Sequence, residues 1–322
     1  MIGGARLNVS FGIVGSGQET EGMPDPGLYR ELAACAEAVG YDSLWSNEHI
    51  SFRHPILEAT TMLAAFASLT RRIRVGTSVL LLPLRHPGLV AKQVASIDYL
   101  AGGRVILGIG VGGEGERDFQ AVEVPAGERG SRTNDSIAAL RKLWSGAPAS
   151  HHGPHFNFDG ISIQPQPARA GGPPIWVGGR SDAAIRRAGL LGDGWLPYLL
   201  STDRFRTGLE AVRRHADGAG RDPDLITPAV MLPTRLDDDR ERARADALEH
   251  LRQRYGGEYG PHLLDRYCLV GNPDDLTRQL RGWIDAGARH IIFNPAGFSR
   301  DRVSDFERLH RLVVSPFKES IG

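Results

Sequence analysis

The chain has 322 residues, of which 38 are Lys or Arg and 38 are Asp or Glu, so the formal net charge is zero. This balance, with no basic block, argues against nucleic acid or an anionic membrane as a partner and favours a small organic molecule. The two cysteines, Cys35 and Cys268, exclude a disulfide framework and a cysteine metal cluster. The chain has no secretory signal and no run approaching the ~18 apolar residues of a membrane span, so a cytoplasmic protein is expected.

Apolar, β-branched runs alternate with segments of helical periodicity along the whole chain. The runs expected to form strands are 7–14, 41–45, 73–82, 105–109, 174–177, 194–198, 226–232 and 290–294. The segments expected to form helices are 28–39, 56–69, 87–100, 132–144, 182–191, 203–219, 238–255, 273–286 and 304–314. This alternation predicts the α/β class and a single (β/α)8 TIM barrel that spans residues 1–322. In such a barrel the chemistry belongs at the carboxyl ends of the strands.

One long segment, residues 147–173, interrupts the alternation after the fourth helix. It is rich in Pro, Gly and His and has no helical period, so an insertion is expected, with a small hairpin around 156–163. Its histidines, His151, His152 and His155, are expected to be solvated. No H-x-H on the first strand and no H-E-x-x-H on a helix occurs, so no metal site is predicted.

The stretch GGRVILGIGVGGEGERDF at 102–119 combines an apolar run with closely spaced glycines. Gly108, Gly110 and Gly113 match the G-x-G-x-x-G pattern of dinucleotide-binding folds. That fold needs the pattern on its first strand and a helix directly after it, whereas here the strand is the fourth and the helix begins late. We therefore interpret these glycines as positions where the backbone passes close to a ligand.

Two strand ends carry polar residues suited to chemistry. Glu48 and His49 follow the second strand, where a histidine can donate a hydrogen bond or transfer a proton near neutral pH. The alternative is a histidine held by a neighbouring loop. The turn 178–181 (GGRS) follows the fifth strand and opens a helix, so backbone amides, a hydroxyl and a guanidinium could converge on a phosphate. The alternative there is an ordinary turn with Ser181 as the helix N-cap.

Seven segments, taken together and in order, carry a family likeness. They are GYDSLWSNEH at 40–49, RVGTSVLLLPLRHP at 74–87, GGRVILGIGVGG at 102–113, ERGSR at 128–132, PIWVGGRS at 174–181, GDGWLP at 192–197, and GNPDDL with DAGARHIIF near the end. Over nearly its full length the chain resembles the bacterial luciferase-like superfamily, in particular its single-chain oxidoreductases that depend on a flavin or a deazaflavin.

The resemblance implies that a flat ring, of the deazaflavin coenzyme F-420 (F420) or of FMN, lies across the strand ends. In the family a non-prolyl cis peptide often ends the third strand, which corresponds here to Ser78 and Val79. Further cofactor contacts are implied after the fourth and fifth strands, with the phosphate at the turn 178–181. These residues are Val111, Gly112, Gly113, Val177, Gly178, Gly179, Arg180 and Ser181. Glu48 and His49 would lie near the reactive ring carbon and are the predicted catalytic residues.

The leading hypothesis is an oxidoreductase that transfers a hydride between F420 and an organic substrate, with His49 donating a proton or positioning the ring. The alternatives are an FMN-dependent monooxygenase that uses molecular oxygen, and a barrel that binds the flavin without turnover. Family members that oxidise a sugar phosphate have a glutamate where this chain has Gly113, so that activity is not predicted unless Glu114 substitutes. The resemblance also suggests a homodimer.

Overall fold

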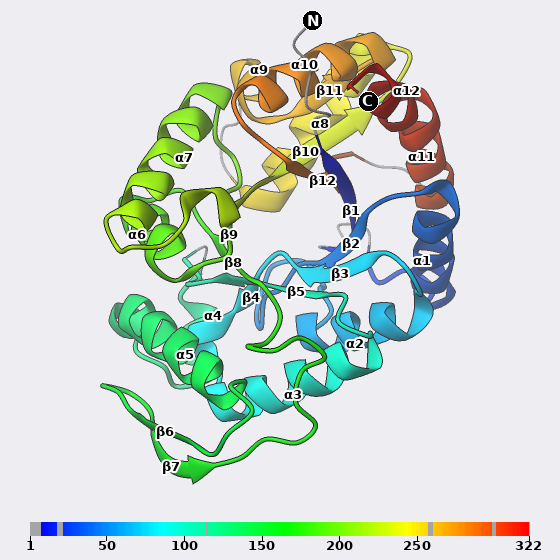
Figure 1. The fold of residues 1–322 in the computed structure, drawn as a ribbon. Helices are drawn as coiled ribbons and strands as arrows, with labels where there is room; N and C mark the ends of the chain where they lie inside the picture. The colour runs from blue at the N-terminus through cyan, green and yellow to red at the C-terminus, as the bar shows by residue number, and fades with distance from the viewer. Residues whose placement is uncertain (1–7, 18–21, 114, 257–259, 298–300, 322) are drawn as a thin grey trace, which may run out of the picture.

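The computed structural model describes residues 8–17, 22–113, 115–256, 260–297 and 301–321, and its parallel strands close into an eight-stranded barrel (Figure 1). The predicted α/β barrel is therefore confirmed. The barrel strands are β1 Ser10–Ser16, β2 Ser43–Ser46, β3 Arg74–Thr77 with its continuation β4 Leu80–Leu81, β5 Val105–Gly110, β8 Ile175–Gly178, β9 Gly194–Leu196, β10 Thr227–Leu236 and β12 His290–Pro295. Pairing between β9 and β10 closes the ring.

Helices surround the barrel on the outside, as Figure 1 shows. They are α1 Gly27–Val39, α2 Ala59–Leu69, α3 Pro87–Leu100, α5 Arg129–Leu143, α6 Asp182–Leu191, α7 Thr202–Asp217, α8 Arg240–Tyr255, α10 Pro273–Asp285, α11 Arg302–Leu309 and α12 Ser315–Ile321. Residues at the helix termini determine where several of these helices begin or end. Gly40 ends α1 with a φ of 96°, which favours glycine, and Asn272 begins α10 in a capping box with Asp275.

The strands bury both of their faces, and this produces two cores. Side chains that point inward form one cluster within the barrel: Val14, Trp45, Ile106, Trp176, Leu196, Ala229, Met231 and Ile292. Side chains that point outward, such as Ile13, Leu44 and Leu107, pack against the helices. Because successive residues of a strand face opposite sides, near-continuous apolar runs fill both cores.

The third predicted strand, 73–82, is interrupted. A cis peptide joins Ser78 to Val79 between β3 and β4, at the bond that the family resemblance implies. The neighbouring strand β5 accommodates the irregularity, because a Cβ on Gly108 would lie 1.9 Å from the Thr77 carbonyl oxygen and one on Gly110 would lie 2.5 Å from Val79 Cγ2. These two glycines therefore make room for the adjacent strand, which corrects their interpretation as points of ligand approach.

The segment between α5 and β8 contains an antiparallel hairpin of β6 Ala149–His152 and β7 Asn157–Ile161. The expectation that its histidines are all solvated is wrong for His151. That side chain is buried, and its Nε2 lies 2.7 Å from Asp135 Oδ1 on α5. The His151 imidazole can be buried because the Asp135 carboxylate replaces water as its hydrogen-bond partner, and this contact connects the hairpin to α5.

Smaller elements complete the fold. They are α4 Arg117–Gln120, α9 Pro261–Tyr267, and β11 Leu269–Gly271, which pairs with the carboxyl-terminal end of β10. Within the described residues, no helix is long and apolar enough to span a membrane.

Candidate active site at the carboxyl ends of the strands

Strand pairing brings three of the predicted segments to one edge of the sheet. Leu80 of β4 pairs with Ile109 of β5, and Ile109 pairs with Val177 of β8. Ser78–Val79, 111–113 and 177–181 therefore meet at the carboxyl ends of neighbouring parallel strands. This edge is where an α/β barrel places its ligands.

His49 lies just beyond β2 and is held by Asp118 of α4. The Nδ1 atom of His49 donates a hydrogen bond to Asp118 Oδ2 at 2.8 Å, and the imidazole stacks on Phe52 with ring centroids 4.2 Å apart. The hydrogen bond orients the ring and places the proton on Nδ1, as a carboxylate partner does in many acid–base sites. Asp118 thus directs the opposite ring edge, with Nε2, away from α4.

Asp118 is itself locked by the loop that follows β2. Its Oδ1 accepts hydrogen bonds from the amides of Ile50 at 2.7 Å and Ser51 at 2.8 Å. Burial works to raise the pKa of Asp118, but the hydrogen bonds from His49 and these amides outweigh it and leave the pKa below its ordinary value. The carboxylate therefore stays ionised at neutral pH and acts as a fixed acceptor for His49.

Glu48 is also buried, but its carboxylate contacts protein groups at both oxygens. Oε2 accepts from the amide of Leu81 at 3.0 Å, and Oε1 pairs with Arg85, which also contacts Glu58 at 2.7 Å. Burial raises the pKa of Glu48 above its ordinary value, against the opposing effect of Arg85. This arrangement links the end of β2 to β4, next to the cis peptide.

Two buried polar atoms near the cis peptide have no hydrogen-bond partner among the described residues. They are Ser16 Oγ at the end of β1 and Asn47 Nδ2 after β2, and the two residues are joined by the bond from the Asn47 amide to the Ser16 carbonyl at 2.9 Å. Ser78 Oγ donates to Asn47 Oδ1 at 2.9 Å. Since buried polar groups are normally satisfied, these atoms fit a polar ligand at the strand ends.

The turn 178–181 is packed against the same region. A Cβ on Gly178 would lie 2.9 Å from Val79 Cγ1, so glycine allows the turn to approach the cis peptide. Ser181 caps α6 by accepting from the Ala184 amide, and Arg180 donates to the carbonyls of Tyr198 and Leu199. Arg180 therefore orders the loop after β9, and it lies directly before the N-terminus of α6, where backbone amides are left without partners inside the helix.

After β5, the chain leaves open space beside the backbone. Gly112 and Gly113 have φ values of 73° and 152°, and a Cβ on Gly113 would meet no described atom within 4 Å. The side of Gly112 is closed by the ring of Phe119. Gly113 thus offers room for a ligand, while Glu114 lies outside the described residues.

Several residues at this end of the barrel are not identifiable from the sequence. Asp118 is one of them. A hydrogen-bonded group is another: it joins Tyr198 after β9 to Tyr255 of α8, with their hydroxyls 2.6 Å apart, and Asn294 of β12 lies 3.4 Å from the Tyr198 hydroxyl. Asn47 stands in the polar run that follows the second strand and could be identified there, whereas no local pattern marks Asp118 or Tyr255.

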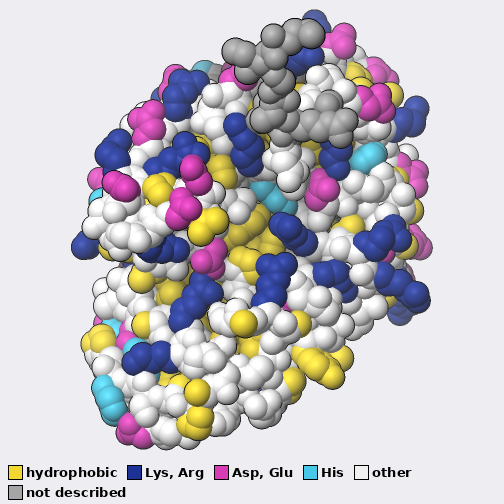
Figure 2. Space-filling model, viewed as in Figure 1, with side chains coloured by type: hydrophobic (Ala, Val, Ile, Leu, Met, Phe, Trp, Pro, Cys, Tyr) yellow, Lys and Arg dark blue, Asp and Glu magenta, His cyan; other side chains and the backbone are white. Residues whose placement is uncertain are grey.

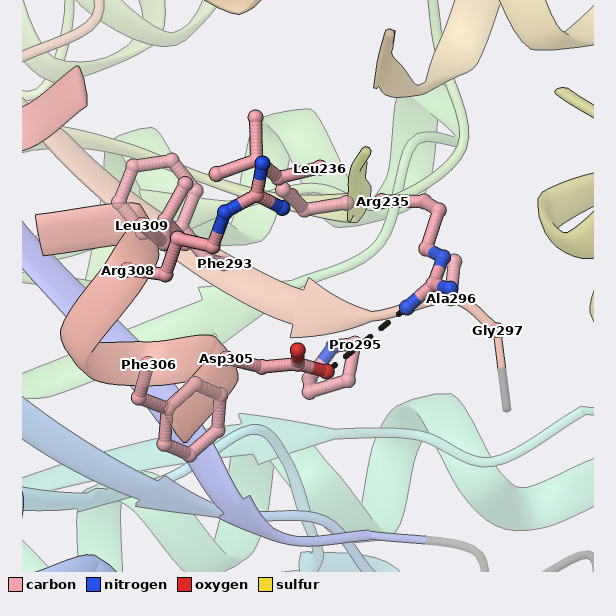
Figure 3. Close-up of a pocket in the computed structure, with 11 residues that line it drawn as sticks. Arg235, Leu236, Phe293, Pro295, Ala296, Gly297, Asp305, Phe306, Arg308 and Leu309 are labelled. Carbon is pink, nitrogen blue, oxygen red and sulfur yellow. Dashed lines mark ion pairs between the residues drawn. The ribbon is translucent and has the colours of Figure 1, made fainter. Parts of the chain in front are cut away.

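Another hollow, between the ends of β10 and β12 and helix α11, is too small for a cofactor ring. It has a volume of about 40 Å³, and Figure 3 shows Arg235 reaching across it toward Asp305, 3.7 Å away. Among the described residues, no group of three or more His, Cys, Asp or Glu side chains could hold a metal ion.

Comparison with known proteins gives the same architecture. A family model described as luciferase-like monooxygenase matches residues 8–290. An F420-dependent glucose-6-phosphate dehydrogenase of Nakamurella multipartita is 30% identical over 309 residues, covering 86% of this chain and 89% of that protein.

Two solved structures share the fold at lower identity. A coenzyme F420-dependent tetrahydromethanopterin reductase from Methanopyrus kandleri superposes with a TM-score of 0.79 at 18% identity, covering 96% of this chain and 99% of that one. A monooxygenase from Streptomyces bottropensis has a TM-score of 0.79 at 22% identity, with 96% and 98% covered.

Proposed function

The chain belongs to the luciferase-like monooxygenase family, and we propose that it is an oxidoreductase that transfers a hydride between coenzyme F420 and a small organic substrate. One observation carries the proposal. The His49–Asp118 pair, with Nδ1 and Oδ2 2.8 Å apart, stands at the strand ends where 78–79, 111–113 and 177–181 meet. The named F420 dependence of the Nakamurella multipartita relative supports the choice of cofactor.

The residues at the strand ends fit a flat, phosphorylated cofactor. We assign the ring to the surface of Ser78, Val79, Val111, Gly112 and Gly113, where Gly113 leaves space and Asn47 Nδ2 and Ser16 Oγ have no partner among the described residues. Val177 lies in β8 next to Gly178, and its buried side chain packs in the core between the barrel and the helices. The phosphate is assigned to the turn of Gly178, Gly179, Arg180 and Ser181, whose amides lie at the start of α6. When bound, the deazaflavin exchanges the hydride with the substrate.

We assign the proton to His49. Since Nδ1 is committed to Asp118, proton donation or acceptance falls to Nε2 at the opposite edge of the ring. The ionised Asp118 stabilises the imidazolium that forms when His49 takes up a proton, and the amides of Ile50 and Ser51 hold Asp118 in place. The pair therefore supplies a positioned proton carrier and its electrostatic partner.

Glu48 has a different role in this proposal. Its contacts with Arg85 and the Leu81 amide favour positioning the end of β2 against β4 over touching a substrate. The sugar phosphate in the name of the relative is not extended to this chain, because the family resemblance implies that sugar-phosphate enzymes have a glutamate at the position of Gly113. A homodimer, suggested by the family resemblance, completes the proposal.

The test is a titration of the cofactor-free protein with oxidised F420 and, separately, with FMN, followed by cofactor fluorescence. We expect saturable F420 binding that weakens when Ser78 is replaced by a bulky residue, for example Ser78→Phe. Tight FMN binding with no affinity for F420 would overturn the assignment in favour of a flavin enzyme.

A further inference from the structure

A second cavity lies at the amino-terminal mouth of the barrel, at the opposite end from the candidate active site. It has a volume of about 530 Å³ and is lined by residues at or before strand starts, including Arg74 of β3, Pro174 before β8 and Thr227 of β10. Figure 2, seen from this side, shows hydrophobic side chains near the centre of the face with Lys and Arg side chains around them. The volume falls within the roughly 300–1,000 Å³ of small-molecule pockets.

Positive charge exceeds negative charge on the lining. The charged residues there are Arg74, Arg141, Arg169 and Asp193. Asp193 is already engaged, since it pairs with Arg141, accepts from the Ile175 amide at 2.8 Å and lies 3.8 Å from Arg221. The negative charge of Asp193 is therefore already paired and attracts Arg74 and Arg169 only weakly.

Arg74 and Arg169 are both exposed, and neither forms an ion pair with a described residue. The charge of Arg169 acts on the buried carboxyl of Asp98, but Asp98 accepts hydrogen bonds from the amides of Val105 and Ala168 and lies beneath the loop. Two guanidinium groups thus remain available at one cavity in a chain whose formal net charge is zero.

The floor of the cavity is apolar and neutral. Ile106 and Trp176 belong to the cluster of side chains that fills the barrel. His290 lies beneath them, 5.0 Å from the Trp176 ring and 2.8 Å from Ser43 Oγ. Burial, and then the charges of Arg74 and Lys318, lower the pKa of His290 to about 3, so this imidazole carries no charge at neutral pH.

We propose that this mouth binds a small organic anion, with its carboxylate or phosphate group on Arg74 and Arg169 and its apolar body beside the exposed side chain of Leu225, above the closed floor of Ile106 and Trp176. Guanidinium groups match the two oxygens of such anions with paired hydrogen bonds. Leu225 supplies apolar contact at the rim of the cavity, and the excess positive charge attracts the anion from solution. The site is independent of the strand ends that we assign to F420.

The test is isothermal titration calorimetry with benzoate as the probe, on the wild-type protein and on Arg74→Gln, Arg169→Gln and Arg30→Gln. Arg30 is an exposed arginine of α1 away from the cavity and serves as the matched control. Loss of one charged hydrogen-bond donor is expected to weaken benzoate binding about tenfold in the first two variants. Arg30→Gln is expected to bind as the wild type does.

Benzamide, which has the same ring without the charge, is expected to bind at least about tenfold more weakly than benzoate, because it cannot form the charge-assisted pair. Absence of benzoate binding, equal binding by all variants, or equal binding of benzamide would each overturn the proposal. Since both replaced arginines are exposed, the variants are expected to keep the circular dichroism spectrum and the F420 affinity of the wild type. A failure of F420 binding in every protein would contradict the proposed function alone.

Discussion

Asp118 Oδ2 and His49 Nδ1 lie 2.8 Å apart although the two residues are 69 positions apart in the chain. The pair joins the loop after β2 to the short helix after β5, two barrel positions away. A carboxylate that is ionised, buried and fixed by backbone amides is a suitable partner for a histidine that must exchange a proton. Asp118 therefore connects the fold of this end of the barrel to its proposed chemistry.

Removal of the carboxylate is expected to loosen the loop that carries His49. In Asp118→Ala the amides of Ile50 and Ser51 lose their acceptor, and hydrogen bonds to a charged group contribute about 1.5–3 kcal/mol. Their hydrogen exchange, measured by NMR, is expected to accelerate by about tenfold or more. Asp203→Ala, at an exposed carboxylate of α7, is the control, and unchanged exchange in Asp118→Ala would contradict the role of Asp118.

Replacement of the proton carrier is expected to affect turnover more than cofactor binding. In His49→Gln the amide can hydrogen-bond but cannot transfer a proton, so kcat with any substrate that reduces F420 is expected to fall about 100-fold. The Kd for F420, from fluorescence titration, is expected to stay within a few-fold of the wild-type value. A variant that turns over normally would show that His49 is not the proton carrier.

The Glu48–Arg85 pair makes a prediction about stability. Arg85→Gln leaves the buried Glu48 carboxylate without its cationic partner, and breaking a buried pair on one side costs about 3–5 kcal/mol. Glu48→Gln with Arg85→Gln removes both charges and is expected to recover part of that loss in the free energy of urea unfolding. A double variant no more stable than Arg85→Gln would mean that the pair is not the source of the effect.

The glycines of β5 can be tested by adding one methyl group. A Cβ on Gly108 would lie 1.9 Å from a backbone oxygen of the neighbouring strand, which cannot move without disturbing the sheet. Gly108→Ala is expected to destabilise the protein by about 1–3 kcal/mol in chemical denaturation. Gly127→Ala, where a Cβ meets nothing described within 4 Å, is the matched control and is expected to be nearly neutral. Equal effects of the two changes would contradict the close packing against Thr77.

Stability is expected to fall on acidification below pH 6.5. The pKa of His290 is lowered to about 3 by burial, and the pKa of His250 is likewise lowered to about 3, first by burial and then by Arg254. Both histidines therefore bind protons in the unfolded chain at a pH where the folded protein binds none. Their contribution is complete above pH 6.5 and declines by about 1.4 kcal/mol per pH unit for each histidine as the pH falls toward 3.

Urea denaturation of the wild type and His290→Gln between pH 7 and pH 4 checks this slope. The variant is expected to lose stability less steeply, by the contribution of about one proton. His152→Gln, at an exposed histidine of the hairpin, is expected to retain the wild-type slope. An identical slope in His290→Gln would mean that His290 does not carry the pH dependence.

The barrel is predictable from the sequence because buried parallel strands are apolar on both faces and alternate with periodic helices. The break at Ser78 and Val79 is not predictable in this way, since the run 73–82 is mostly apolar with no turn signal and only the family resemblance indicates the cis peptide. The three-residue strand β11 was also missed, because it is held by pairing with β10, by burial of Leu269 and Val270 and by hydrogen bonds between Val270 and Gln279. Short elements of that kind depend on tertiary contacts and leave no periodic signal.

Part of the candidate site could also be predicted from the sequence, and part could not. Residues that follow strands can be identified locally, and the pairing of β4, β5 and β8 brings those segments together. The residues that contact them cannot be identified locally, because these contacts join distant parts of the chain. Examples are the contacts of His49 with Asp118, of Glu48 with Arg85 and of Arg180 with the loop after β9. The burial of His151 was missed for this reason too, since Asp135 lies on the preceding helix.

A crystal structure of the protein grown with oxidised F420, with a parallel crystal grown with FMN, tests the assigned cofactor and its place in the barrel. We expect F420 density at the carboxyl ends of the strands, with the ring against Ser78 and Val79, the phosphate at 178–181 and His49 at the ring edge. A ring bound elsewhere, or FMN but not F420 at the strand ends, would contradict this assignment.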